Sequence, residues 1–327
     1  MRAWRVESYG EPAVALRLAE TPAPEPGPRQ LLVRVLAAPA NFPDVLLCRG
    51  QYQVRPDLPF TPGVEACGEV VTVGSEVAGF AVGDRVVGSC VLPHGSFATE
   101  ALMEAAVTFP APPALDDAEA SGFVIAYQTG WFALHDRAHL QPGETLLVHA
   151  AAGGVGTAAV QLGRAAGARV VAVVGGAAKA EVARRCGADV VVDRHTEDVV
   201  AAVREATGGR GADVVFDPVG GDAYAQSTKC VAFEGRIVVV GFASGTMPSP
   251  PLGHALVKNY AIVGLHWGLY AQVDPSRVRA AHEQLLRLVA EGAIAPVVGE
   301  RVPFDGLPEG VQRLADGVTV GRVVWEA

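Results

Sequence analysis

Apolar residues in the first 120 positions form short runs rich in valine and leucine, and glycine or proline separates one run from the next. The clearest runs are residues 31–36, 69–73 and 84–88. Short strands with a turn about every ten residues are typical of a small barrel. The first part of the chain is therefore predicted to be a barrel-like β domain.

The hydrophobic pattern changes near residue 118, where helices and strands begin to alternate. Asp116 and Asp117 are suited to cap a helix that runs to about His139. The predicted strands that follow are residues 146–149, 170–174, 190–192, 214–216, 237–240 and 262–265, and the predicted helices are residues 154–166, 178–186 and 198–207. Valine-rich strands separated by helices indicate a parallel sheet covered on both faces, which is the doubly wound α/β (Rossmann) fold.

Two more elements are expected near the C-terminus. Apolar residues share one helical face through residues 278–289, and the run at residues 321–325 resembles a strand. A lone strand needs a partner, and the β-rich first region is the natural one. We therefore predict a discontinuous first domain, residues 1–122 and 265–327, into which a nucleotide-binding domain, residues 123–264, is inserted.

Composition and charge narrow the class of protein. Half of the 327 residues are apolar and only 19% are charged, which excludes intrinsic disorder. The net charge of −9 and the lack of basic runs argue against a nucleic-acid ligand. Charges at residues 1–7 and the absence of a long uncharged apolar stretch predict a cytoplasmic protein with no membrane partner. The five cysteines form no C-x-x-C pair and are expected to be buried thiols.

A glycine-rich loop carries the strongest chemical signal. Residues 146–156 read Leu-Leu-Val-His-Ala-Ala-Ala-Gly-Gly-Val-Gly, after a strand and before a helix, as a dinucleotide fingerprint requires. Ala151 replaces the first glycine, whereas Gly153 would let the backbone approach a pyrophosphate and Gly156 would let helix and strand pack closely. The alternative is a helix start that binds nothing. The residues predicted to bind the cofactor are Ala152, Gly153, Gly154, Val155 and Gly156.

The second strand of this domain indicates which dinucleotide is bound. Enzymes that use NAD carry an acidic residue there, which binds the ribose 2′-hydroxyl. Here the strand is followed by Gly175 and Gly176, and Lys179 and Arg194 supply positive charge. Small residues make room for a 2′-phosphate and cations bind it, so NADPH is predicted. The alternative for Lys179 is an ordinary solvated lysine.

Further motifs are spread over the whole chain. They are Asn41-Phe42-Pro43-Asp44, Gly50-Gln51-Tyr52, Pro62-Gly63-Val64-Glu65, Tyr127-Gln128-Thr129-Gly130, the run from Gly211 to Gly221, and Gly321-Arg322-Val323-Val324. Together with the glycine loop they resemble the zinc-independent quinone oxidoreductase (zeta-crystallin-like) family of medium-chain dehydrogenases/reductases. The resemblance implies a GroES-like catalytic domain beside the Rossmann domain, and a homodimer.

The resemblance also implies that no metal is bound. Zinc-dependent relatives carry a cysteine where Asn41 stands and a histidine where Val64 stands. A catalytic zinc needs about three protein ligands, which the remaining Asp44 and Glu65 do not supply. These two carboxylates are interpreted as structural hydrogen-bonding groups.

The resemblance places further residues around the nicotinamide. Asn41 and Tyr52 would lie beside it as the catalytic polar groups, with structural roles as the alternative for each. Thr129 would bind the nicotinamide amide. The backbones of two segments that follow sheet strands would flank the ring, and these segments are Gly241, Phe242 and Ala243, and Leu265, His266 and Trp267. Among the histidines, only His266 is kept as a possible substrate contact, and His149 is expected to be a core residue.

Three functions remain open at this point. Without a Lewis acid, reduction of an electrophilic acceptor is easier than oxidation of an alcohol. The first hypothesis is therefore NADPH-dependent hydride transfer to a quinone, a small-molecule acceptor. The second is reduction of a conjugated thioester, ketone or aldehyde, as in an enoyl or 2-alkenal reductase. The third is a crystallin-like protein that binds NADPH without turnover.

Overall fold

The computed structural model describes residues 1–327, which divide into two units. Unit 1 comprises Met1–Ile125, Pro275–Arg279 and Pro296–Ala327, and unit 2 comprises Ala126–Asp274 and Ala280–Ala295. Residues 265–274 and 280–295 thus lie in unit 2, whereas the sequence assigned all of 265–327 to the first domain. Side-chain contacts accompany this placement: the rings of Phe132 and Tyr270 stack at 4.2 Å, Trp267 donates a hydrogen bond to Gln128, and Gln161 donates one to the Ala295 carbonyl.

Unit 1 is built around a six-stranded sheet in the order β13-β14-β3-β4-β5-β6. Its elements are β1 (Arg2–Val6), α1 (Pro12–Ala15), β2 (Leu16–Glu20), β3 (Gln30–Pro39), α2 (Phe42–Cys48), β4 (Glu65–Val73), β5 (Arg85–Cys90), β6 (Glu100–Pro110), α3 (Asp117–Ser121), β13 (Val298–Pro303), the 3-10 helix η2 (Phe304–Gly306), α12 (Leu307–Ala315) and β14 (Arg322–Glu326). Because β3 also pairs with β6, strands β3 to β6 close into a ring. The predicted barrel-like arrangement is confirmed.

The C-terminal strand β14 joins this sheet, as predicted. It pairs antiparallel with β3, with Val324 opposite Pro39, and parallel with β13. The buried core beneath the sheet includes Val33 of β3, Phe97 and Trp325. The last strand of the chain is therefore held against β3 of the N-terminal region.

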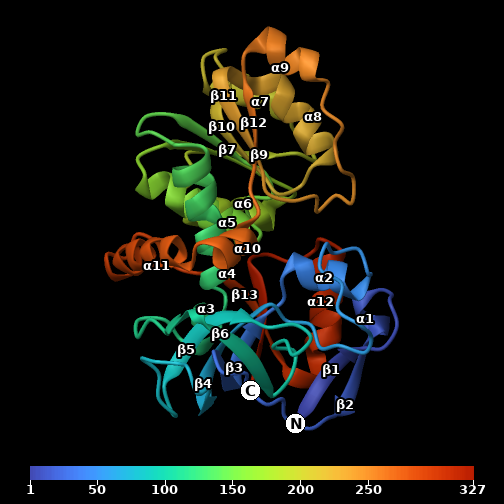
Figure 1. Ribbon diagram of the computed structural model, residues 1–327. Coiled ribbons are helices and arrows are strands. Elements are labelled where there is room, and N and C mark those ends of the chain that lie inside the picture. Colours follow the sequence, from blue (N-terminus) through green and yellow to red (C-terminus); the bar gives the residue numbers. More distant parts are fainter. The chain divides into compact units, whose positions relative to one another are not determined.

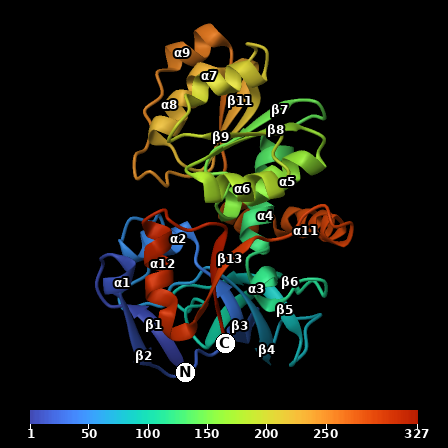
Figure 2. The same cartoon turned by 180° about the vertical axis from the view of Figure 1, so that it is seen from behind.

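Unit 2 contains a parallel sheet in the order β12-β11-β10-β7-β8-β9 (Figure 1, and from behind in Figure 2). Its elements are the π-helix η1 (Phe132–Arg137), β7 (Thr145–Val148), α5 (Gly154–Ala165), β8 (Arg169–Val174), α6 (Ala177–Arg185), β9 (Val190–Asp193), α7 (Val199–Ala206), β10 (Ala212–Asp217), α8 (Gly221–Cys230), β11 (Val231–Val239), α9 (Leu252–Lys258), β12 (Ala261–Gly264) and α10 (Trp267–Val273). The helices α4 (Val124–Trp131) and α11 (Pro275–Ala290) each have residues in both units. This strand order is that of a Rossmann fold, as predicted.

Alternate residues of the strands face opposite layers of helices. Leu146 points to Gly163 of α5, and its neighbour Leu147 packs in the core with Val203 of α7 and Tyr224 of α8. Because successive strand residues point to opposite faces, α5 and α7 cover different sides of the sheet. All six strands end at one edge, where ligands of such folds bind.

The predicted single helix over residues 116–139 is divided in the structure. Asp116 caps α3 through the amide of Glu119, but Gly122 interrupts the helix before α4, which continues into the π-helix η1. No helix of the chain combines the length and the apolar character that crossing a lipid bilayer requires.

Candidate functional site

The glycine loop is a tight turn between β7 and α5. Ala150 has a positive φ of 49°, which residues other than glycine rarely adopt. Its carbonyl accepts a hydrogen bond from the Gly153 amide at 2.9 Å. Gly156 fits directly under this turn: a Cβ there would overlap the Ala150 carbonyl oxygen and lie 2.8 Å from Cα of Ala151. The predicted role of Gly156 in close packing therefore has a geometric basis.

The start of α5 offers backbone donors. Gly153 is its N-cap residue, no side chain caps the helix, and its first turn contains no acidic residue. Gly153, Gly154 and Val155 are partly exposed. Amides and the positive end of a 12-residue helix thus remain available, and both favour an anion such as a pyrophosphate.

Positive charges gather at the ends of β8 and β9. Burial, and then the nearby charge of Arg194, lowers the pKa of Lys179, so the two cations lie within electrostatic reach. A Cβ on Gly175 would lie 2.9 Å from the His195 ring and 3.2 Å from Nε of Arg194, which shows that both side chains fold over this glycine. Sequence reasoning missed His195, although its position beside Arg194 was visible.

The Asp193 carboxylate, at the end of β9, faces backbone amides. Asp193 Oδ1 accepts hydrogen bonds from the amides of Gly176 and His195, each at 3.0 Å. These bonds are the main cause that lowers the pKa of Asp193. The end of β8 itself carries no acid, so the arrangement fits a ligand with an additional phosphate.

The other predicted cofactor residues of unit 2 lie after neighbouring strands at the same edge. The segment 241–243 follows β11 and is tied to the preceding loop by a bond from the Ala243 amide to the Pro218 carbonyl, 3.0 Å. Leu265 follows β12, and Trp267 Nε1 donates to Gln128 Oε1 at 2.9 Å. Thr129 is next to this glutamine in α4 and is mostly buried. The edge thus carries the glycine loop and both predicted flanking segments.

The two histidines singled out in the sequence differ in environment. His149 is buried, and its Nε2 lies 2.8 Å from Oγ of Ser227, so the expected core role is confirmed. His266 is exposed and precedes α10 as its N-cap residue.

Asn41 lies in unit 1 within a buried polar group. Its side-chain Nδ2 donates to Oε1 of Glu65 at 3.1 Å, and its Oδ1 accepts from Nη1 of Arg322 at 3.0 Å. The same Nη1 lies 3.0 Å from the Glu65 carboxylate. The sequence singled out Asn41, but it gave no role to Arg322.

Asp44 and Tyr52 follow Asn41 closely in the sequence, and the charge of Asp44 acts on the Tyr52 phenol. Asp44 is buried, and its two oxygens accept from the amides of Asn41 and Gly63 at 2.8 and 2.9 Å. Burial raises the pKa of Asp44 to about 7. Burial, and then the charge of Asp44, raises the pKa of Tyr52, so its phenol stays protonated at neutral pH.

The remaining carboxylate, Glu65, has both oxygens occupied as well. Oε1 contacts Asn41 and Arg322, and Oε2 accepts from the Ile125 amide at 2.9 Å. This agrees with the structural interpretation of Asp44 and Glu65. No three His, Cys, Asp or Glu side chains of the chain lie close enough together to hold a metal ion.

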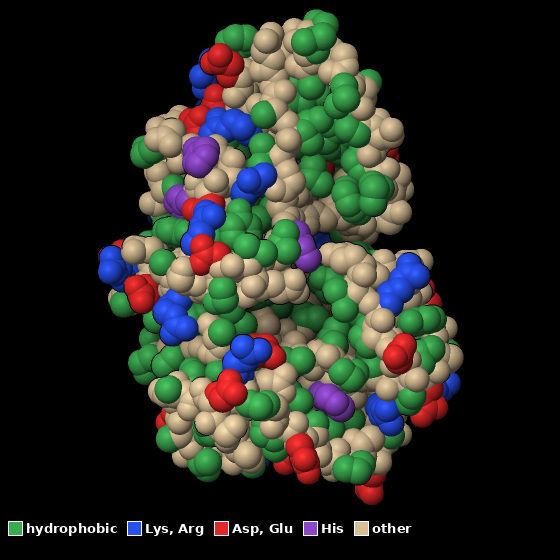
Figure 3. Space-filling model, viewed as in Figure 1, with side chains coloured by type: hydrophobic (Ala, Val, Ile, Leu, Met, Phe, Trp, Pro, Cys, Tyr) green, Lys and Arg blue, Asp and Glu red, His purple; other side chains and the backbone are tan.

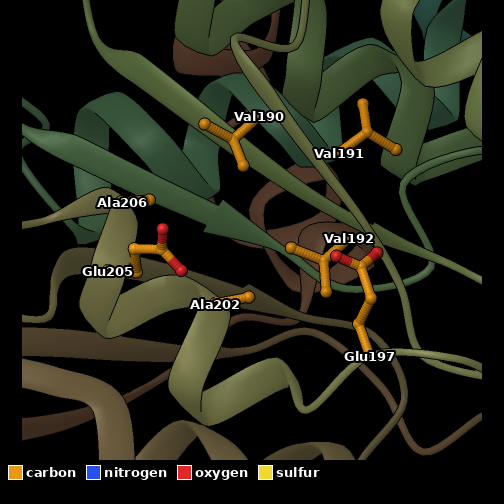
Figure 4. A pocket seen from close by; sticks show the side chains of 7 residues that line it. All are labelled: Val190, Val191, Val192, Glu197, Ala202, Glu205 and Ala206. Carbon is orange, nitrogen blue, oxygen red and sulfur yellow. The ribbon is translucent and has the colours of Figure 1, made fainter.

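A hollow in unit 2 lies away from these residues. It has a volume of about 270 Å³ between β9 and α7 (Figure 4). Its lining consists of Val190, Val191, Val192, Glu197, Ala202, Glu205 and Ala206. None of these is a predicted site residue, so the hollow is not the candidate site.

Comparison with known proteins identifies both domains. Residues 27–113 match the family model of the alcohol dehydrogenase GroES-like domain, and residues 154–291 match that of zinc-binding dehydrogenases. A quinone oxidoreductase-like protein 2 homolog from Nematostella vectensis is 38% identical to this chain over 91% of its length and 82% of the relative.

Solved structures agree over the full length. Escherichia coli quinone oxidoreductase complexed with NADPH has a TM-score of 0.93 at 29% identity and covers 100% of both chains. A mycobacterial protein complexed with NADPH has a TM-score of 0.93 at 31% identity, again over 100% of both chains. The predicted GroES-like and Rossmann folds are therefore confirmed, and the chain belongs to the quinone oxidoreductase family of medium-chain dehydrogenases/reductases.

Proposed function

We propose that this protein is a metal-free oxidoreductase that transfers a hydride from NADPH to a quinone. The observation that carries the choice of cofactor is the pair Lys179 and Arg194 at the ends of β8 and β9, where an NAD enzyme would carry an acid. Related structures that hold NADPH support the same choice. The amides of residues 154–156, at the start of α5, would bind the pyrophosphate.

The bound nicotinamide supplies the hydride, and the chain supplies position and a proton. Thr129 and the segments 241–243 and 265–267 would orient the ring, because positioning contributes most to a hydride transfer between two bound partners. The phenol of Tyr52 stays protonated and is the donor best suited to the oxygen of the reduced acceptor. Asn41 would also bind the cofactor, as the family resemblance implies.

The absence of a metal in this proposal rests on the ligand set. Asn41 and Val64 occupy the positions where zinc-dependent relatives carry thiolate and imidazole ligands. The two nearby carboxylates already bind protein donors with all four oxygens. Metal analysis of the purified enzyme, with and without a chelator, is expected to show full activity without stoichiometric zinc.

The first experiment is a comparison of acceptors. NADPH and NADH oxidation are followed with 1,4-benzoquinone, 9,10-phenanthrenequinone, crotonyl-CoA and a 2-alkenal. Rapid loss of NADPH with the quinones alone supports the proposal. Preference for crotonyl-CoA or the alkenal would replace it with an enoyl or alkenal reductase, and tight NADPH binding without turnover would favour a non-catalytic role.

The cofactor assignment has a separate test. Lys179→Ala is expected to weaken NADPH binding about tenfold and to leave NADH nearly unchanged, because one charged hydrogen bond is lost. Lys229→Ala removes the same charge from an exposed site on α8 and serves as the control. Equal losses for both cofactors in Lys179→Ala would contradict a 2′-phosphate site there.

We also propose a homodimer formed through β12. This strand lies at the edge of the unit 2 sheet, where a second copy can add its own strand. The nearby helix α9 exposes Leu252, Leu256 and Val257 by 74, 78 and 79%, and apolar side chains gather over this end of unit 2 (Figure 3). Light scattering should show a dimer that Leu256→Asp weakens and that Val82→Asp, on exposed Val82 of unit 1, leaves intact.

A further inference from the structure

The loop that follows β10 in unit 2 is folded around one buried carboxylate. Asp217, the last residue of β10, is 1% exposed. Its Oδ1 accepts hydrogen bonds from the amides of Val219 and Gly220 at 2.8 and 2.9 Å. An aspartate that binds the amides just after it closes a turn in this way. A single side-chain oxygen therefore sets the path of the chain between β10 and α8.

This turn is bonded in its turn to the loop that follows β11. Three backbone hydrogen bonds join the two loops, from Ala243 to Pro218 and from Ser244 to Val219, each at 3.0 Å, and from Gly221 to Thr246 at 3.1 Å. The loops also touch at Gly220, where a Cβ would lie 2.9 Å from both Cδ1 of Phe242 and the Thr246 carbonyl oxygen. A displacement of the β10 loop therefore displaces the β11 loop as well.

The joined loops lie beside the point where the strand order of the sheet reverses. The chain passes outward through β7, β8 and β9 and then returns to β10, on the other side of β7. In sheets of this kind a dinucleotide binds across the carboxyl ends of the strands at the reversal. The glycine loop, Lys179 and Arg194 follow β7, β8 and β9, so the joined loops are the part of this edge on the opposite side of the reversal.

The carboxylate of Asp217 is only half satisfied. Oδ2 is buried without a hydrogen-bond partner. The charge of Asp217 acts on the imidazole of His149, but burial lowers the pKa of His149, so this ring stays neutral at pH 7 and does not neutralise the carboxylate. A buried carboxylate without a counter-charge and with one unmet oxygen is a poor source of stability, which favours a role in fixing the geometry of the loop.

We propose that Asp217 is a positioning residue that holds the loops after β10 and β11 together as one wall of the dinucleotide site. Asp217 is itself too deeply buried to touch a ligand, so it acts through the backbone of the two loops. This inference rests on the proposed function and deepens it. Its test measures cofactor binding alone and so does not depend on which acceptor is reduced.

The test compares a complete cofactor with a fragment that reaches only one side of the reversal. Dissociation constants of NADPH and of 2′,5′-ADP are measured by calorimetry for Asp217→Ala. We expect NADPH to bind about tenfold more weakly and 2′,5′-ADP within about twofold of the native protein, because the fragment needs only the side that carries Lys179. Asp217→Asn keeps an oxygen that accepts from both amides and should bind NADPH within about twofold of the native protein.

The same strand provides a matched control. Asp213 lies at the other end of β10, and its Oδ2 accepts from the Thr145 amide at 2.8 Å. Asp213→Ala removes a carboxylate–amide bond from β10 far from the ligand edge, so it should lower Tm and leave the ratio of the two dissociation constants unchanged.

A variant that leaves Asp217 in place guards against misfolding of Asp217→Ala. The new methyl group of Gly220→Ala would press on Phe242 and Thr246 and separate the two loops. It should show the same selective loss of NADPH affinity. Combined with Asp217→Ala it should lose less than the product of the two single losses, because both changes act through one pair of loops.

Several results would overturn the positioning role. They are an unchanged NADPH affinity or an equal loss for both ligands in Asp217→Ala, a loss in Asp217→Asn as large as that in Asp217→Ala, and a selective loss in Asp213→Ala. If the native protein binds NADPH but reduces no acceptor, the proposed reaction fails while this test still stands. If it binds neither NADPH nor 2′,5′-ADP, the cofactor assignment and this inference fail together.

Discussion

Replacement of Gly156 by alanine tests the packing of the glycine loop most directly. The new methyl group would overlap the carbonyl oxygen of Ala150 and lie 2.8 Å from Cα of Ala151, where ordinary contact begins at 3.4 Å. Both neighbours are backbone atoms, so α5 and the turn must separate by about 0.6 Å to relieve the contact with Ala151, and by more to relieve the overlap with the Ala150 oxygen. Overpacking of this kind typically destabilises by about 1–3 kcal/mol, and alanine recovers up to about 1 kcal/mol of helix propensity.

We therefore expect Gly156→Ala to lower the free energy of unfolding by about 2 kcal/mol, which corresponds to a fall in Tm of about 4–8 °C. Thermal unfolding measured by circular dichroism checks the value. The displaced turn should also weaken NADPH binding, because the amides of the loop no longer converge on one anion.

Two glycines nearby provide matched controls. A Cβ on Gly153 would meet only the Ala150 oxygen at 3.4 Å, so Gly153→Ala should keep its stability but crowd the pyrophosphate and weaken NADPH binding. In Gly163→Ala, on the same helix, the closest neighbours are side-chain methyl groups of Leu146 and Val170, which can adjust more easily than backbone atoms. The reasoning is refuted if the free energy of unfolding of Gly156→Ala lies within about 0.5 kcal/mol of the native value, or if Gly163→Ala loses as much free energy of unfolding as Gly156→Ala.

Three further perturbations follow from the structure. Folding raises the pKa of Asp44 to about 7, so the free energy of unfolding should fall as pH rises from about 4 to about 7, by at most about 4 kcal/mol. Urea unfolding measured across this pH range should show the fall in the native protein, and Asp44→Asn should not show it. Ala150→Gly should raise Tm, because glycine adopts the positive φ at this position without strain, which adds up to about 1 kcal/mol to the free energy of unfolding. A fall in Tm would show that Ala150 is not strained. The Arg236 guanidinium contacts both oxygens of Glu144, at 2.7 and 2.9 Å, so Arg236→Lys should lower the free energy of unfolding, measured by chemical denaturation, by about 1–2 kcal/mol. An unchanged value would show that this two-bond contact adds no stability.

The sequence predicted those parts of the fold whose side chains repeat with a clear period. The central strands of unit 2, such as β7 and β8, were found because they are buried on both faces and therefore read as continuous apolar runs. Helix α8 was missed because its buried face consists of Tyr224, Ser227 and Cys230, a set without a strong apolar pattern. Helix α9 buries none of its residues, so nothing in its pattern distinguishes it from a loop.

The candidate cofactor site was predictable to the extent that it depends on local position. Lys179 and Arg194 follow strands β8 and β9, and the carboxyl ends of neighbouring parallel strands meet at one edge of a sheet. The contact of His195 and Arg194 with Gly175 depends on how the loop after β9 folds back, which no periodicity encodes. Charge could be assigned to this edge from the sequence, but its shape could not.

The buried polar group around Asn41 shows what was out of reach and why. Arg322 is 281 residues away from Asn41 in the chain, so no spacing rule connects them. The connection is made by strand register: β14 pairs antiparallel with β3, with Val324 opposite Pro39, and the Ala40 amide donates to the Val323 carbonyl. Continued two residues beyond Pro39, this register brings Arg322 opposite Asn41. A shift of β14 by one residue would turn its side chains to the other face, so the contact of Asn41 with Arg322 depends on how the end of the chain joins the sheet.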